Sequence, residues 1–142
     1  REITFIGSGK LGYPDTAVAA LALGCDMINV GREAMMAIGC IQAQRCHTGH
    51  CPTGVATQSP WLSRGLNPND KSVRVMNYLA ALQHEILRLS NSIGVTHPAL
   101  IPESAVEIID QKGSAVSILN YYGLSSFEQR FRESDLDYLV NN

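Results

Sequence analysis

Three cysteines stand close together in the first half of the chain, in the stretch CIQAQRCHTGHCPTG. Cys40, Cys46 and Cys51 follow the spacing C-x5-C-x4-C, and the remaining cysteine, Cys25, also lies in the first half. A disulfide framework would spread cysteines through a small secreted chain, usually behind a secretory signal. Clustered cysteines in a chain without a signal pattern favour a metal or redox site. We therefore expect a cytoplasmic protein that binds a metal or cluster through these thiols.

The spacing of the thiols leaves three interpretations open. Structural zinc sites use closely paired cysteines and four ligands, so zinc would need His47 or His50 in addition. Three thiolates suit a three-iron cluster or an incompletely ligated four-iron cluster, and Pro52 after Cys51 resembles the end of the bacterial ferredoxin pattern. Buried, inert thiols are the third possibility, and the one we expect for Cys25. The spacing favours a cluster over zinc.

The segments around the thiols alternate between strand and helix patterns. Residues 2–7 form a short β-rich run, after which a helix with Asp15 as its N-cap is expected to stop at Gly24. The apolar run 26–31 predicts a buried strand, and a helical pattern resumes over residues 32–44. This order predicts an α/β fold with a parallel sheet and right-handed crossovers.

Glycine-containing turns follow both predicted strands. GSGKLG, residues 7–12, fits the dinucleotide-binding pattern G-x-G-x-x-G, but Tyr13-Pro14 interposes a turn and no acidic residue ends the second strand. The turns Gly7–Lys10 and Gly31–Arg32 each offer backbone N–H groups near a cation, which suits a phosphate group. In (β/α)8 barrels the loops after the last two strands commonly bind phosphate. The alternative is that these glycines only make tight turns beside solvated cations.

The second half of the chain predicts helices. A helix of about 20 residues is expected to begin with Asp70 as N-cap and to stop at Gly94. Its apolar stripe, with steps of three and four, consists of Val75, Leu79, Leu82, Ile86, Leu89 and Ile93. We expect this stripe to pack within the same protein rather than in a coiled coil. Another helix is expected over residues 102–113, and a capping box at Ser125 predicts a last short helix.

The composition argues against two other kinds of partner. The net charge is −2 and no basic patch is present, so nucleic acid is not expected to bind. No apolar run approaches the roughly 20 residues that a membrane span needs. The chain begins REITFIG without an initiator methionine, which we interpret as a cut or processed end.

The stretch MINVGREAMMAIGCIQAQRCHTGHCPTGVATQ resembles the end of the FMN-binding synthase domain of glutamate synthases and their relatives. The resemblance covers roughly residues 3–125. It implies that Cys40, Cys46 and Cys51 bind a 3Fe-4S cluster. It also implies that the two turns form the phosphate end of an FMN site on a (β/α)8 TIM barrel. The residues implied for that site are Ser8, Gly9, Lys10, Gly31 and Arg32.

The chain departs from the family pattern in two respects. Better-known members carry a G-G-hydrophobic-Arg turn where this chain reads Ser8-Gly9-Lys10-Leu11, so we expect Lys10 to assist the phosphate. Only about two barrel strands are present, and a barrel cannot close from two strands. We therefore expect residues 1–58 to be the last two βα units plus the cluster loop, and residues 59–142 to be a helical C-terminal extension packing on the barrel.

The resemblance implies an oxidoreductase that forms glutamate from 2-oxoglutarate through 2-iminoglutarate, with electrons passing from the cluster to FMN. The catalytic residues are unknown, because the substrate-contacting residues are expected outside this chain. The implied partners are the remainder of the barrel and an electron donor, in an oligomer or a longer chain. Two alternatives stay open: a related methylamine–glutamate N-methyltransferase, and a non-catalytic, zinc- or cluster-stabilised module that docks onto partners.

Overall fold

The computed structural model describes residues 3–124, and its first elements alternate between strand and helix. Strands β1 (Ile6–Ser8) and β2 (Met27–Asn29) pair in parallel, joined through helix α1 (Pro14–Ala22). Helix α2 (Arg32–Ala37) follows β2. The predicted α/β class and the order strand, helix, strand, helix are therefore confirmed. Within the described residues this sheet has two strands.

Helix α1 begins two residues earlier than the sequence pattern indicates. Its N-cap is Tyr13, with Pro14 in the first turn, so the prediction that Asp15 caps the helix is wrong. Proline is favoured here because the first helical residues have no N–H partner within the helix, and its fixed φ already suits a helix. The predicted stop is confirmed: the helix ends at Ala22, and Gly24 adopts a φ of +91°.

Helix α2 is much shorter than the helical pattern over residues 32–44 predicts. It ends at Ala37, and Gly39 then adopts a φ of +110°. Gln42 and Gln44 also have left-handed backbones, with φ of 56° and 55°, so the helix cannot continue through them. The segment that carries the cysteines is therefore a loop, interrupted by the 3-10 turn η1 (Cys46–Thr48) and the short helix α3 (Pro60–Ser63).

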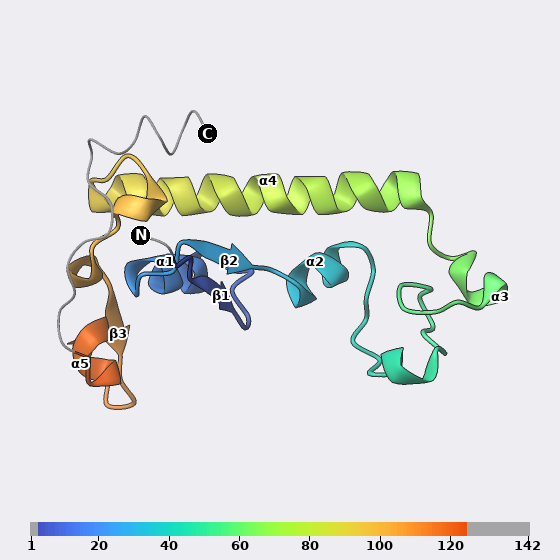
Figure 1. Cartoon of the computed structure of the whole chain (residues 1–142), viewed down its shortest axis with the longest axis horizontal. Coiled ribbons are helices and arrows are strands. Elements are labelled where there is room, and N and C mark those ends of the chain that lie inside the picture. The colour runs from blue at the N-terminus through green and yellow to red at the C-terminus, as the bar shows by residue number, and fades with distance from the viewer. Residues whose placement is uncertain (1–2, 125–142) are drawn as a thin grey trace.

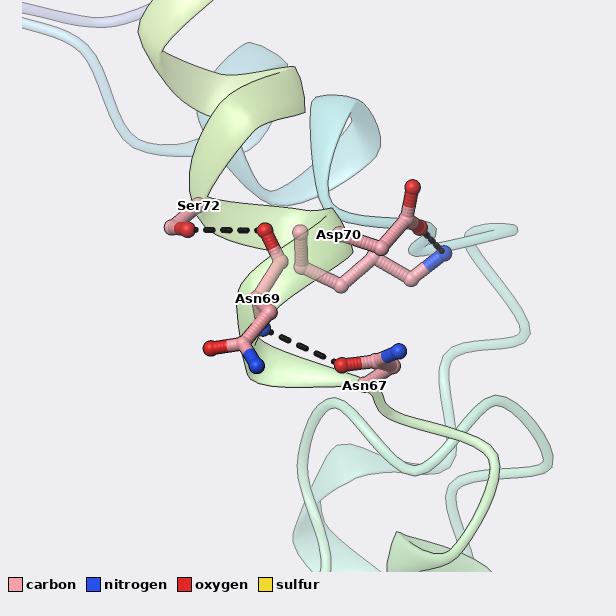
Figure 2. A network of polar contacts seen from close by, with 5 residues as sticks. Asn67, Asn69, Asp70 and Ser72 are labelled. Carbon is pink, nitrogen blue, oxygen red and sulfur yellow. Dashed lines mark hydrogen bonds and ion pairs between the residues drawn. The ribbon is translucent and has the colours of Figure 1, made fainter.

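Helix α4 (Pro68–Ile93) is the longest element. Its N-cap is Asn67, whose side chain accepts a hydrogen bond of 3.1 Å from the N–H of Asn69, so the prediction of Asp70 as N-cap is wrong (Figure 2). Asp70 lies in the first turn instead, where a carboxylate favours the positive end of the helix dipole. Gly94 ends the helix with a φ of +93°, as predicted. No helix of residues 3–124 has the length and apolarity needed to cross a membrane.

The core lies where α4 packs against α1. Its buried members are Ala17, Val18, Ala22, Leu82, Ile86 and Ile101. From the predicted apolar stripe of α4, Leu82 and Ile86 are buried, and Leu89 and Ile93 pack beside them. Leu79 is 46% exposed. The expectation that the stripe packs within the same protein is therefore confirmed for its second half.

The segment after α4 folds into a β-hairpin, so the helix predicted over residues 102–113 is wrong. Two 3-10 turns, η2 (Pro98–Leu100) and η3 (Glu103–Ala105), precede the antiparallel strands β3 (Glu107–Ile109) and β4 (Ala115–Ser117). The side chain of Asp110 accepts hydrogen bonds from the N–H groups of Lys112 and Ser114 at 2.8 and 2.9 Å. This turn competes with the helix, because Asp satisfies the backbone locally.

Helix α5 (Ile118–Tyr122) follows the hairpin, and Tyr121 and Tyr122 on it are each more than half exposed. The capping box predicted at Ser125 lies outside the described residues. Figure 1 shows β1, β2 and α1 below one half of α4, with the hairpin at that end. The cysteine loop lies below the other end, and α3 lies beyond it. Helix α4 thus extends from the end of the structure that holds the cysteine loop to the end that holds the hairpin.

The α1–α4 interface predicts a large stability effect at Leu82, which is 7% exposed. We expect Leu82→Ala to lower the free energy of unfolding by about 2–4 kcal/mol, because it removes buried methyl groups and leaves a cavity. Leu79→Ala, one turn earlier on the same helix, should cost less than about 1 kcal/mol. Urea denaturation followed by circular dichroism measures both. Equal losses for the two variants would contradict this position of the core.

Candidate functional site

The two turns predicted to bind phosphate lie at one edge of the parallel strand pair. Ser8 at the end of β1 pairs with Asn29 at the end of β2, so the turns that leave the two strands start side by side. In Figure 1 both arrowheads point toward the side on which α2 and the cysteine loop lie. All five predicted residues, Ser8, Gly9, Lys10, Gly31 and Arg32, are exposed. The structure therefore brings the predicted phosphate turns together.

The backbone at these turns leaves room for a ligand. A Cβ added at Gly9 or Gly31 would have no atom of the described residues within 4 Å. Gly9 has a φ of +117° and Lys10 a φ of 56°, so successive residues leave the extended conformation of β1. Turns of this kind can present backbone N–H groups to an anion. The fit to a phosphate group therefore rests on open space, turn geometry and two nearby cations.

The residues just after the first turn are tightly packed. The hydroxyl of Thr16 donates to the carbonyl oxygens of Lys10 and Tyr13, each at 3.0 Å. Gly12 is buried, and the hydroxyl of Tyr78 on α4 donates to its carbonyl oxygen at 2.7 Å. Sequence reasoning missed Gly12 and Tyr78. The sequence contains no local signal for this pair, because the two residues lie 66 positions apart.

The three predicted cluster ligands lie on one loop but are not gathered around a common point. Cys40 is half-buried, Cys46 is exposed at the start of η1, and Cys51 is 7% exposed. Within residues 3–124 all the cysteines are free thiols, and no group of three His, Cys, Asp or Glu side chains is close enough together to hold a metal ion. The donor set fits thiolate ligation by its chemistry, and ligation would require the loop to close.

The sulfur of Cys51 sits among hydrogen-bond donors. The hydroxyl of Thr53 lies 3.4 Å from it, and the backbone N–H groups of Ala56, Thr53 and Val55 also face it. These contacts, the Thr53 hydroxyl first, lower the pKa of the Cys51 thiol from 9.0 to about 7. A lowered pKa favours the thiolate, which is the form that binds metals. The thiol of Cys51 therefore ionises more readily than a free cysteine, which favours metal binding.

Cys40 and His50 also form hydrogen bonds within the loop. The N–H of Gln42 donates to the sulfur of Cys40 at 3.4 Å, so Cys40 also receives a backbone donor. The Nδ1 atom of His50 lies 2.8 Å from the carbonyl oxygen of Thr48, which ties that ring to its own loop. His47 is exposed on η1. Neither histidine is brought to the three sulfurs as a group.

Helix α3 holds the end of the cysteine loop. Gly54 is buried with a φ of +79°, and an added Cβ would lie 2.6 Å from the carbonyl oxygen of Leu62. Only glycine allows this approach of the two backbone segments. At the C-cap of the same helix, the guanidinium of Arg64 lies 5.4 Å from the ring centre of the exposed Trp61. The loop is therefore anchored at its end, close to Cys51, whereas Cys46 lies on its exposed part.

An apolar pocket of about 530 Å³ lies between β2 and α4, away from these residues. It is lined by side chains such as Met27, Ile28 and Leu82, with Asp26 and His97 as polar members. None of the predicted site residues is among the described residues that line it. We therefore do not assign the pocket to the candidate site.

The pKa of Cys51 supports a specific prediction. Thr53→Val removes the largest cause of the lowered pKa, so the pKa of Cys51 should rise from about 7 toward 9. At pH 7 the wild-type thiol is then about half ionised and the variant thiol mostly protonated. The measurement is the pH dependence of alkylation at Cys51, followed by mass spectrometry on the reduced, metal-free protein.

Thr48→Val is the matched control, because the hydroxyl of Thr48 donates to the carbonyl oxygen of Arg45 rather than facing a sulfur. The pH dependence of alkylation at Cys51 in this variant should match that of the wild type. An equal upward change in both variants would show that the loop as a whole, and not the Thr53 hydroxyl, sets this pKa.

Comparison with known proteins identifies the family. The family profile described as "Conserved region in glutamate synthase" matches residues 1–96, which is more than half of the chain. The matched region contains both turns and all three cysteines of the candidate site. The chain belongs to the glutamate synthase family.

Individual relatives agree with this assignment. The glutamate synthase large subunit-like protein YerD of Bacillus subtilis is 38% identical over 119 residues, covering 84% of this chain and 23% of that protein. An archaeal glutamate synthase (NADPH) of Archaeoglobus fulgidus is 42% identical over 95 residues, or 67% of this chain and 19% of that protein. The ferredoxin-dependent glutamate synthase of Cyanidium caldarium is 42% identical over 97 residues, or 66% and 6%. The chain thus spans less than a quarter of the length of these relatives.

Proposed function

We propose that this chain is the part of a glutamate synthase-type oxidoreductase that holds the phosphate of FMN and carries a 3Fe-4S cluster. The observation that carries the proposal is the pair of exposed turns at one edge of β1 and β2, followed in the chain by the three-thiol loop. The family assignment supports the glutamate synthase class. The reaction we propose for the whole protein is the reductive formation of glutamate from 2-oxoglutarate through 2-iminoglutarate, in the cytoplasm.

Backbone strain at the proposed site supports a functional role. Lys10, Gln42 and Gln44 are the non-glycine residues with positive φ among the residues that the structure describes. One lies in the first phosphate turn and the other two lie between Cys40 and Cys46. Left-handed conformations cost free energy for such residues and tend to persist where function requires them. All three strained positions thus coincide with the two proposed cofactor segments.

The proposed cofactors divide the chemistry with the chain's own residues. When bound, the cluster supplies single electrons and FMN collects two and delivers a hydride to the substrate. The turns after β1 and β2 offer N–H groups to the phosphate, and Lys10 and Arg32 add positive charge beside it. Cys40, Cys46 and Cys51 would supply thiolates, and the hydrogen-bond donors around Cys51 favour negative charge on its sulfur.

We further propose that β1 and β2 are the last two strands of a (β/α)8 barrel whose other strands belong to a longer protein. Ile6 and Met27 on these strands are 62% and 57% exposed, which is unusual because parallel sheets are normally covered on both faces. Residues 59–142 remain a proposed extension that packs on the barrel. Its α4 already shares one core with α1.

Metal content tests the cluster. We expect the full-length protein, purified without oxygen, to contain about three iron and four acid-labile sulfide per chain. Cys46→Ala should lose both while FMN stays bound, because Cys46 lies outside the phosphate turns. Cys25→Ala is the matched control and should keep the iron, because Cys25 lies against Gly7 and outside the cysteine loop. A content of one zinc per chain without sulfide would overturn the cluster proposal and leave the alternative of a zinc-stabilised, non-catalytic module.

Flavin affinity tests the phosphate turns. We expect Lys10→Gln to weaken FMN binding by about tenfold, because it removes a charged partner of the phosphate. Lys112→Gln, in the hairpin turn, should leave the affinity unchanged. Fluorescence titration of FMN into the flavin-free, full-length protein measures both. Equal FMN affinities in the two variants would contradict the role of Lys10. In a separate assay of the full-length protein, N-methylglutamate as the product would favour the methyltransferase alternative.

A further inference from the structure

Tyr78 joins α4 to the first of the two proposed phosphate turns. Its hydroxyl donates to the carbonyl oxygen of Gly12 at 2.7 Å, where the chain passes from the turn into α1. A Cβ added at Gly12 would lie 2.5 Å from that hydroxyl, so no larger residue fits between the turn and α4. The contact therefore depends on glycine at one side and on a hydroxyl donor at the other.

Glu33 brings the second turn to the same point. It follows Gly31 and Arg32 directly, lies in the first turn of α2, and is 7% exposed. A Cβ at Gly12 would lie 2.5 and 2.6 Å from the Cγ and Cβ atoms of Glu33. Gly12 is thus packed between Tyr78 and Glu33. One contact point connects the end of the first turn, the start of the helix after the second turn, and α4.

The hydroxyl of Tyr78 is held in its donor form. Burial raises its pKa above the usual 10.0, and the negative charge of Glu33 raises it further. The group therefore stays protonated at neutral and mildly alkaline pH. The hydroxyl therefore remains available as a donor to the carbonyl oxygen of Gly12.

We propose that Tyr78 is a positioning residue that sets the spacing between the two phosphate turns. This inference rests on the proposed function of those turns. A phosphate bound by N–H groups from both turns requires the two sets of donors at a fixed separation. The pairing of Ser8 with Asn29 aligns the points where the turns leave the strands. Beyond that pairing, the contact of Gly12 with Tyr78 and Glu33 holds the exposed turns from behind.

The test compares FMN with riboflavin, which has the same ring system without the phosphate. We expect the full-length, flavin-free Tyr78→Phe variant to bind FMN about three- to tenfold more weakly than wild type, and riboflavin with unchanged affinity. Tyr121→Phe on α5 is the matched control, because its ring is more than half exposed and far along the chain from the turns. Gly12→Ala should show the same pattern with a larger loss for FMN.

The outcomes separate this inference from the proposed function. Wild-type protein that binds FMN and riboflavin equally well would overturn the phosphate site, and the inference with it. A wild-type preference for FMN that survives unchanged in Tyr78→Phe would overturn the inference alone. Equal weakening of both flavins in Tyr78→Phe would show a general structural role and would also overturn it.

Discussion

The packing of α4 against α1 is the interaction on which the other parts of the structure depend. Small side chains on α1, Ala17 and Ala22, allow close approach of the larger Leu82 and Ile86 on α4. A two-stranded parallel sheet would have little stability without such cover. Helix α4 therefore supplies the surface on which β1, β2 and α1 assemble, although it begins at Pro68, long after β2 ends at Asn29.

The same helix places the candidate site. Its middle supports the turn after β1 through Tyr78, and its N-terminus, capped by Asn67, begins where the cysteine loop and α3 end. The phosphate turns thus lie on a packed scaffold, whereas the thiols lie on a loop that is anchored mainly at Gly54. This difference explains why the structure brings the turns together but leaves the three sulfurs apart. The turns are positioned by the core, and the loop lacks a comparable packing partner.

Sequence patterns were reliable where the signal is local and strong. The strand–helix alternation, the stops at Gly24 and Gly94, and the buried stripe around Leu82 follow from periodicity and from glycine's access to positive φ. They failed where two local preferences compete. Residues 107–117 were expected in or beside a helix, but the Asp110 turn and the β-branched residues beside it form a hairpin. Similarly, α2 ends at Ala37 before the left-handed Gly39, and the left-handed Gln42 and Gln44 keep the helix that apolar spacing predicted from resuming.

The sequence by itself determined the family and the residue types of the candidate site, because cysteine spacing and turn glycines are encoded within a few dozen residues. The tertiary structure alone decided which of these residues meet. The pairing of Ser8 with Asn29 aligns the two turns, and the bond between Tyr78 and Gly12 joins residues 66 positions apart. No periodic pattern records such a contact. It arises only after the core has brought α4 over the strands, and it depends on the space left by one missing side chain at Gly12.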